Sequence, residues 1–144
     1  MKIIIAGSRV LKDVFYNGLV AVMQDMAKRG FVPTEIVSGG AAGVDKMGER
    51  WAEEKAIPVR VFEANWATGN DAGIKRNEEM AAYADALIAI WDGHSDGTQH
   101  MIKTMIALGK PTVMVRLAFM SKIMVPVATE DQPRLWTPDA SLEV

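Results

Sequence analysis

Short apolar runs alternate with stretches of helical periodicity along the first 115 residues, and most of the switches carry a glycine. Residues 3–6 are continuously apolar and end at Gly7, as expected for a strand buried on both faces. Further strands are predicted at 35–37, 59–62, 86–91 and 112–115, with helices at about 15–26, 44–56, 74–83 and 101–108. Strict alternation predicts a doubly wound α/β fold, with helices on both faces of a mostly parallel sheet of five or more strands.

The pattern changes at about residue 117. Pro126, Pro133 and Pro138 cut the remaining chain into short pieces. We therefore expect one domain over residues 1–116 and a C-terminal tail over 117–144. The apolar residues at 119–120 and 123–125 are expected either to add an edge strand or to pack on a helix or a partner subunit, and a loosely ordered arm is the alternative.

Composition excludes several classes of site. The 144 residues contain no cysteine, which rules out disulfide scaffolds, zinc–thiolate and iron–sulfur centres and cysteine nucleophiles. The two histidines alone cannot form a common zinc site, and we expect neither a metal nor a cofactor. A formal net charge of −2 disfavours attachment to nucleic acid or membrane through bulk charge. Binding must depend on local geometry.

The sequence also shows no membrane or export signal. The apolar run at the N-terminus is too short for the core of a signal peptide. The apolar stretch at 112–128 is interrupted by Arg116, Lys122 and Pro126, so it does not resemble a membrane span. A cytoplasmic location is the expectation.

Four polar or glycine-rich loops follow predicted strands, at 7–9, 38–45, 64–77 and 92–98. In an open parallel sheet, ligands bind beyond the carboxyl ends of the strands, which is where these loops lie. Three of the loops lead directly into a helix, whose first turn offers unpaired N–H groups and partial positive charge to a phosphate. Neither a Walker A loop nor a Gly-x-Gly-x-x-Gly fingerprint is present, which disfavours kinases, GTPases and ordinary dehydrogenases.

The same loops, in order, resemble the YspA-like branch of the SLOG superfamily. The similarity covers residues 2–115 and lies in Gly-Ser-Arg at 7–9, Ser-Gly-Gly-Ala-Ala-Gly-Val-Asp at 38–45, Ala-Asn-Trp at 64–66, Ala-Gly-Ile-Lys-Arg-Asn at 72–77 and Asp-Gly-His-Ser-Asp-Gly-Thr at 92–98. The superfamily also contains the Lonely guy phosphoribohydrolases and the DNA-processing protein DprA. The resemblance implies a Rossmann-like, nucleotide-binding fold.

The resemblance and the loop positions together give a set of candidate nucleotide-binding residues. The arginines offer planar forks to a phosphate, the hydroxyls can cap a helix or donate to phosphate oxygens, and Asp45 or Asp92 can accept from ribose hydroxyls. The predicted set is Gly7, Ser8, Arg9, Ser38, Gly39, Gly40, Gly43, Val44, Asp45, Arg76, Asn77, Asp92, Gly93, Ser95, Gly97 and Thr98.

One position departs from the hydrolase branch, whose motif Pro-Gly-Gly-x-Gly-Thr-x-x-Glu ends in a glutamate that assists cleavage. Here Met101 stands at that place, and a thioether cannot accept a proton. We therefore expect a module that binds a nucleotide or phosphorylated nucleoside derivative, as a sensor or by sequestering it. The alternative is a phosphoribohydrolase that cleaves the base–ribose bond, with Asp92, Asp96 or Glu78 replacing the glutamate. No catalytic residue is assigned.

Other features keep two interpretations. Trp66 and Trp91 can stack on a base or fill a gap between loop and sheet. His100 is expected to be a surface or capping residue rather than a catalyst.

Single-stranded DNA is a disfavoured ligand because lysine and arginine are scattered among a slight excess of acidic residues. Related hydrolases are commonly dimers, so a homodimer is expected.

Overall fold

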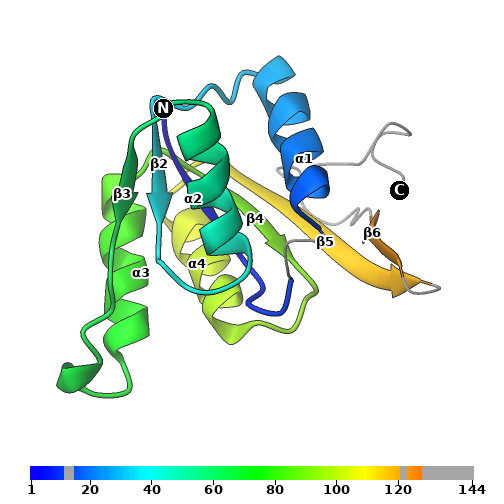
Figure 1. Ribbon diagram of the computed structural model, residues 1–144. Helices are drawn as coiled ribbons and strands as arrows, with labels where there is room; N and C mark the ends of the chain where they lie inside the picture. Colours follow the sequence, from blue (N-terminus) through cyan, green and yellow to red (C-terminus); the bar gives the residue numbers. More distant parts are fainter. Residues whose placement is uncertain (12–14, 121–122, 128–144) are drawn as a thin grey trace.

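The computed structural model describes residues 1–11, 15–120 and 123–127 and shows a six-stranded sheet between two layers of helices (Figure 1). The strands are β1 (Lys2–Gly7), β2 (Glu35–Ser38), β3 (Val59–Val61), β4 (Ala86–Trp91), β5 (Thr112–Met120) and β6 (Ile123–Val127). The helices are α1 (Tyr16–Lys28), α2 (Val44–Glu54), α3 (Ala72–Tyr83) and α4 (Asp96–Ala107), with a short 3-10 helix, η2 (Trp66–Thr68).

The strand order is β3-β2-β1-β4-β5-β6. The first five strands run parallel, and β6 pairs antiparallel with β5. The chain therefore moves outward from β1 to β3 and then crosses back to place β4 on the other side of β1. This reversal between β1 and β4 is the position at which open α/β sheets bind their ligands. The predicted Rossmann-like α/β fold is confirmed.

Two separate cores explain why the central strands are continuously apolar. Ile3 and Ile5 of β1 face α1 and α2, whereas Ile4 and Ala6 face α3 and α4. Residues alternate in the same way along β4, so every side chain of both strands except that of Lys2 is buried. The methionines of the helices fill these cores; Met23 and Met26 pack on one face, and Met80 and Met105 on the other.

Element boundaries differ from the predicted ones where tertiary pairing or a cap decides them. Helix α4 begins at Asp96, five residues before the apolar periodicity, because Ser95 caps its first turn. Strand β3 has only three residues, all exposed at the edge of the sheet, and Phe62 lies outside it. Strand β5 continues to Met120 rather than ending at 115, because β6 pairs with its second half.

The predicted boundary at 116/117 falls inside β5, whose second half pairs with β6. Residues 119–120 belong to β5 and residues 123–125 to β6. The rest of the predicted tail, residues 128–144, lies outside the described residues. In the part of the chain that the structure describes, no helix combines the length and the apolar character needed to cross a membrane.

Candidate functional site

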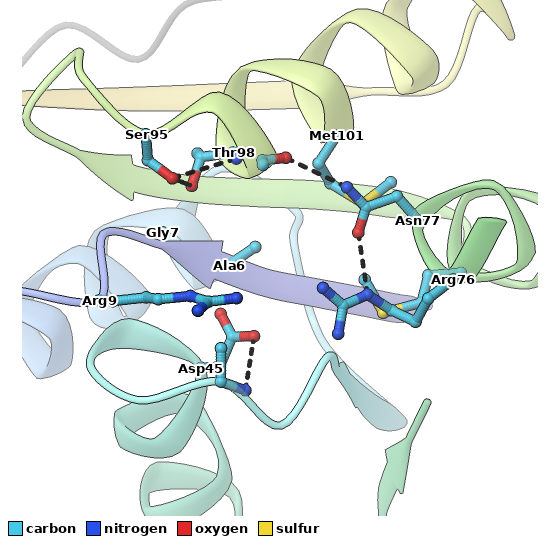
Figure 2. Close-up of a pocket in the computed structure, with 12 residues that line it drawn as sticks. Ala6, Gly7, Arg9, Asp45, Arg76, Asn77, Ser95, Thr98 and Met101 are labelled. Atoms are coloured by element: carbon cyan, nitrogen blue, oxygen red, sulfur yellow. Dashed lines mark hydrogen bonds between the residues drawn. The ribbon is translucent and has the colours of Figure 1, made fainter. Parts of the chain in front are cut away.

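A cleft opens at the carboxyl ends of the strands, above the end of β1. It encloses about 370 Å³ of space between its walls, a figure that includes the part open to solvent. Residues from four segments line it: the end of β1 and the loop after it, the loop and first turn of α2, the middle of α3, and the first two turns of α4 (Figure 2). The lining residues are Ala6, Gly7, Arg9, Ala41, Asp45, Arg76, Asn77, Met80, Ser95, Gly97, Thr98 and Met101.

The first turn of α4 forms one wall of the cleft. Ser95 caps the helix, since its Oγ accepts from the backbone N–H of Thr98 at 3.3 Å and from Thr98 Oγ1 at 3.0 Å. The N–H groups of Asp96 and Gly97 precede any carbonyl that the helix itself could offer them. A Cβ built on Gly97 would meet no heavy atom within 4 Å, so protein packing does not require a glycine there. This wall presents backbone donors and free space together, as an anion site needs.

Two arginines reach into the cleft from opposite sides (Figure 2). Arg9 follows β1 and is exposed. Arg76 is half-buried on α3, where its Nη1 donates to the carbonyl of Gly39 at 2.7 Å and its Nε to Asn77 Oδ1 at 3.1 Å. Burial lowers the pKa of Arg76 and so does the nearby Arg9, whereas Asp45 raises it. Two neighbouring guanidinium groups attract an anion that is placed between them.

Asp45 is the only carboxylate among the described residues that line the cleft. It lies in the first turn of α2, is 6% exposed, and accepts from the backbone N–H of Ala41 at 3.2 Å through Oδ2. Burial raises the pKa of Asp45 from 3.8 to about 6, although the N–H groups of Ala41 and Gly7 and the charge of Arg76 favour its ionised form. The carboxyl therefore changes its charge close to neutral pH.

Asn77 ties α3 to the first turn of α4. Its buried amide nitrogen donates to the carbonyl of Gly97 at 3.1 Å and lies 3.2 Å from His100 Nδ1. Its Oδ1 accepts from Arg76, so one side chain orients both the arginine and the first turn of α4. His100 does not line the cleft; its ring lies behind Asn77, and its Nε2 is 3.5 Å from Thr104 Oγ1.

Eight of the sixteen residues predicted from the sequence line the cleft: Gly7, Arg9, Asp45, Arg76, Asn77, Ser95, Gly97 and Thr98. The other eight lie outside its lining: Ser8, Ser38, Gly39, Gly40, Gly43, Val44, Asp92 and Gly93.

Several of the residues outside the lining brace the loops around the cleft. Ser8 Oγ donates to Asp92 Oδ1 and accepts from the Asp92 N–H, both at 3.1 Å, which joins the loops after β1 and β4. Ser38 Oγ donates to Glu49 at 2.7 Å and accepts from the N–H of Gly40 at 3.0 Å. These residues hold the shape of the cleft from behind.

Two glycines of the loop before α2 lie close to neighbouring segments of the chain. At Gly43, φ is +79° and a Cβ would lie 2.3 Å from the carbonyl oxygen of Ser8. At Gly39, a Cβ would lie 2.7 Å from Arg76 Nη1. The backbone contact and the positive φ require a glycine at Gly43, whereas the contact at Gly39 is with the end of a flexible side chain, and Gly97 has no such contact.

Four lining residues were not predicted as site residues: Ala6, Ala41, Met80 and Met101. Ala6, Met80 and Met101 belong to the core between the sheet and the helices α3 and α4 and give the cleft an apolar part. Met80 lies three and four residues after Asn77 and Arg76 on the same helix, a spacing that could have identified it. Met101, at the position of the hydrolase glutamate, is buried and contributes a thioether.

The two candidate stacking residues differ in exposure. Trp91 is 7% exposed and packs in the core below α3 and α4, so it fills a gap and presents no face to a ligand. Trp66, in η2, is 60% exposed.

Comparisons with known proteins agree with this architecture. The model of the family described as "YspA, cpYpsA-related SLOG family" matches residues 1–69. The Gene 61 protein of Mycobacterium phage D29 is 33% identical over 119 residues, which cover 78% of this chain and 94% of that protein. The structure of DNA processing protein A (DprA) from Streptococcus pneumoniae superposes with a TM-score of 0.67 at 14% identity, over 84% of this chain. The chain spans about half of DprA (52%), and at this identity the likeness concerns the fold alone.

Proposed function

Because the chain belongs to the YspA- and cpYpsA-related SLOG family, we propose that it binds a nucleotide or a phosphorylated nucleoside derivative in the cleft above β1. The proposed role is to sense or sequester that ligand. The observation that carries the proposal is Gly97, which has open space beside unpaired backbone donors and faces a cleft that two arginines enter.

The ligand's phosphate would lie against the first turn of α4. There the N–H groups of Asp96 and Gly97 can donate to its oxygens, and the positive end of the helix adds attraction. Arg9, which is exposed, can close over the phosphate from the opposite side. Asp45 is placed to accept from a ribose hydroxyl when ionised. This arrangement needs no basic surface, in keeping with the net charge of −2.

Gly97→Ala tests the proposal directly. The added methyl group meets no protein atom within 4 Å, and alanine favours a helix over glycine by up to about 1 kcal/mol, so the variant should fold at least as stably as the wild type. A phosphate against the Gly97 N–H would collide with it. We expect at least about a tenfold loss of affinity, which corresponds to about 1.4 kcal/mol.

The assay is isothermal titration calorimetry with nucleoside mono- and diphosphates of the four common bases, ribose 5-phosphate and pyrophosphate. Gln99→Ala, an exposed position in the same part of α4 that does not line the cleft, is the matched control. If none of these compounds binds the wild-type protein, the proposal is wrong. Equal affinity for Gly97→Ala and Gln99→Ala would place the phosphate elsewhere.

One observation favours a second function, hydrolysis of the base–ribose bond. Asp45 is buried in the cleft, and its pKa of about 6 leaves part of it protonated near neutral pH, as a general acid requires. In such a reaction Asp45 would give its proton to the departing base while water adds to C1′ as the C1′–N bond breaks, and the proton that the water loses would pass to solvent, from which the Asp45 carboxylate is protonated again. Chromatography of nucleotides incubated with wild type and Asp45→Asn tests it: free base released only by the wild type supports hydrolysis. Tight binding without release contradicts it for that nucleotide.

A further inference from the structure

Trp66 presents an unusually large apolar surface to solvent. Trp66 is 60% exposed, whereas Trp51 and Trp91 are each 7% exposed. Burying an aromatic side chain of this size is strongly favoured in water, so the exposed indole offers an apolar face to a ligand.

The backbone around Trp66 holds the indole in a defined place. Asn65 caps η2, since its Oδ1 accepts from the N–H of Ala67 at 3.3 Å. The hydroxyl of Thr68 donates to the carbonyl of Asn65 at 2.8 Å, and the N–H of Gly69 donates to the carbonyl of Trp66 at 3.2 Å. The exposed ring is thus carried by a turn with its own hydrogen bonds.

Gly73 allows the edge of the indole to approach helix α3. A Cβ at this position would lie 3.2 Å from Trp66 Cη2, tighter than an ordinary van der Waals contact. Gly73 stands three and four residues before Arg76 and Asn77, and residues at this spacing share one face of a helix. The contact at Gly73 therefore places the indole about one helical turn from two residues that line the cleft.

The surroundings place Trp66 on the same side of the molecule as the cleft. Figure 1 shows η2 and the start of α3 projecting beyond the edge of the sheet at which the loops before α2 and α4 also lie. The cleft itself offers donors, one carboxyl and an apolar part, but none of its described lining residues is aromatic. A bound nucleotide would find phosphate and ribose partners there without a stacking surface for its base.

We propose that Trp66 is the stacking platform for the base of the bound nucleotide, held by η2 and Gly73 one helical turn from the cleft. This inference rests on the proposed function. Stacking uses the π face that every base has and makes no hydrogen-bond readout, so the platform selects nucleotides against base-free sugar phosphates rather than one base against another. The ligand class is therefore a nucleotide that carries an aromatic base.

The experiment compares wild type with Trp66→Leu and Trp66→Phe, using AMP, GMP, CMP, UMP and ribose 5-phosphate in calorimetry. Leucine keeps an apolar side chain but removes the π face, and phenylalanine restores a smaller one. We expect Trp66→Leu to weaken the four nucleotides by about 5- to 150-fold, the range that base–aromatic stacking gives. Ribose 5-phosphate should bind both proteins equally, and Trp66→Phe should recover part of the lost affinity. Thermal melting of each variant separates loss of binding from loss of fold.

The outcomes distinguish this inference from the proposed function. If nucleotides bind wild type and Trp66→Leu with equal affinity, the stacking platform is refuted while the proposed function stands. If Trp66→Leu weakens ribose 5-phosphate as much as nucleotides, Trp66 only shapes the cleft and the inference is also refuted. If no nucleotide binds the wild type, both proposals fail together.

Discussion

Replacing Asp45 by asparagine should remove a specific part of the pH dependence of stability. Asp45 is buried beside Arg76, and its burial raises its pKa from 3.8 to about 6 in the folded protein. Below pH 3.8 the carboxyl is protonated in both states and contributes no difference. As the pH rises toward 6, the unfolded chain ionises while the folded protein keeps its proton, so the free energy of unfolding falls.

The magnitude follows from the two pKa values. Their separation is about two pH units, and each unit corresponds to about 1.4 kcal/mol, so ionisable Asp45 lowers the free energy of unfolding by about 3 kcal/mol in total. The loss is complete once the pH passes the folded-state pKa of about 6, and it is absent only below the unfolded-state pKa of 3.8. The asparagine side chain introduced by Asp45→Asn does not ionise, and so the variant lacks this loss.

The assay is urea unfolding at intervals between pH 4 and pH 8, followed by circular dichroism. Subtracting the variant's free energy of unfolding from the wild type's cancels the other titrating groups, and we expect this difference to fall by about 2–3 kcal/mol, mostly below pH 6.5. The control is Asp71→Asn, at an exposed carboxylate that is paired with Lys75 at 3.2 Å. For this control, we do not expect the fall of about 2–3 kcal/mol in the difference between the two free energies of unfolding. A flat difference for Asp45→Asn, or one that rises with pH, would show that Arg76 and the backbone N–H groups outweigh burial.

Two further substitutions test the packing that shapes the cleft. Gly7→Ala should destabilise the protein by at least about 3 kcal/mol, because its Cβ would lie 1.8 Å from the carbonyl oxygen of Ile90, where neither central strand can yield; a soluble variant with an unchanged melting temperature would contradict this. Lys110→Met should cost about 2 kcal/mol in urea unfolding, because the ammonium group donates to carbonyls at the end of α3, at 2.6 Å to Ala81 and 2.8 Å to Ala84. Equal unfolding midpoints for Lys110→Met and wild type would show that water replaces these bonds at no cost.

The fold could be predicted because its signal is local. Residues 3–6 are continuously apolar because helices cover both faces of β1. A continuous apolar run can be recognised in the sequence without knowledge of distant contacts. The start of α4 could not be predicted from periodicity, since its first turn is polar and exposed apart from Thr98. There the cap at Ser95 determines the boundary, and a serine in a polar loop is a weak signal by itself.

The sequence predicts which loops form the candidate site, but it does not predict which residues of those loops line the cleft. Gly43 and Gly97 look alike in the sequence, yet a side chain at Gly43 would collide with the backbone of the loop after β1, whereas at Gly97 it would enter open space. Only three-dimensional contacts distinguish a glycine that the fold requires from one that leaves room for a ligand. In the same way, Asp45 lines the cleft while Asp92 pairs with Ser8, although both follow strands at the same edge.

Met101 bears on how the cleft can hold an anion in a protein with a net charge of −2. A carboxylate at this position would be a second negative charge in the cleft besides Asp45. Both carboxylates would partly neutralise the positive charge of Arg9 and Arg76. The thioether adds no charge and, with Ala6 and Met80, makes part of the lining apolar, where electrostatic attraction is stronger than in water. The substitution that removes the hydrolase glutamate therefore leaves more of the arginines' charge for a phosphate. This supports binding over cleavage as the proposed role.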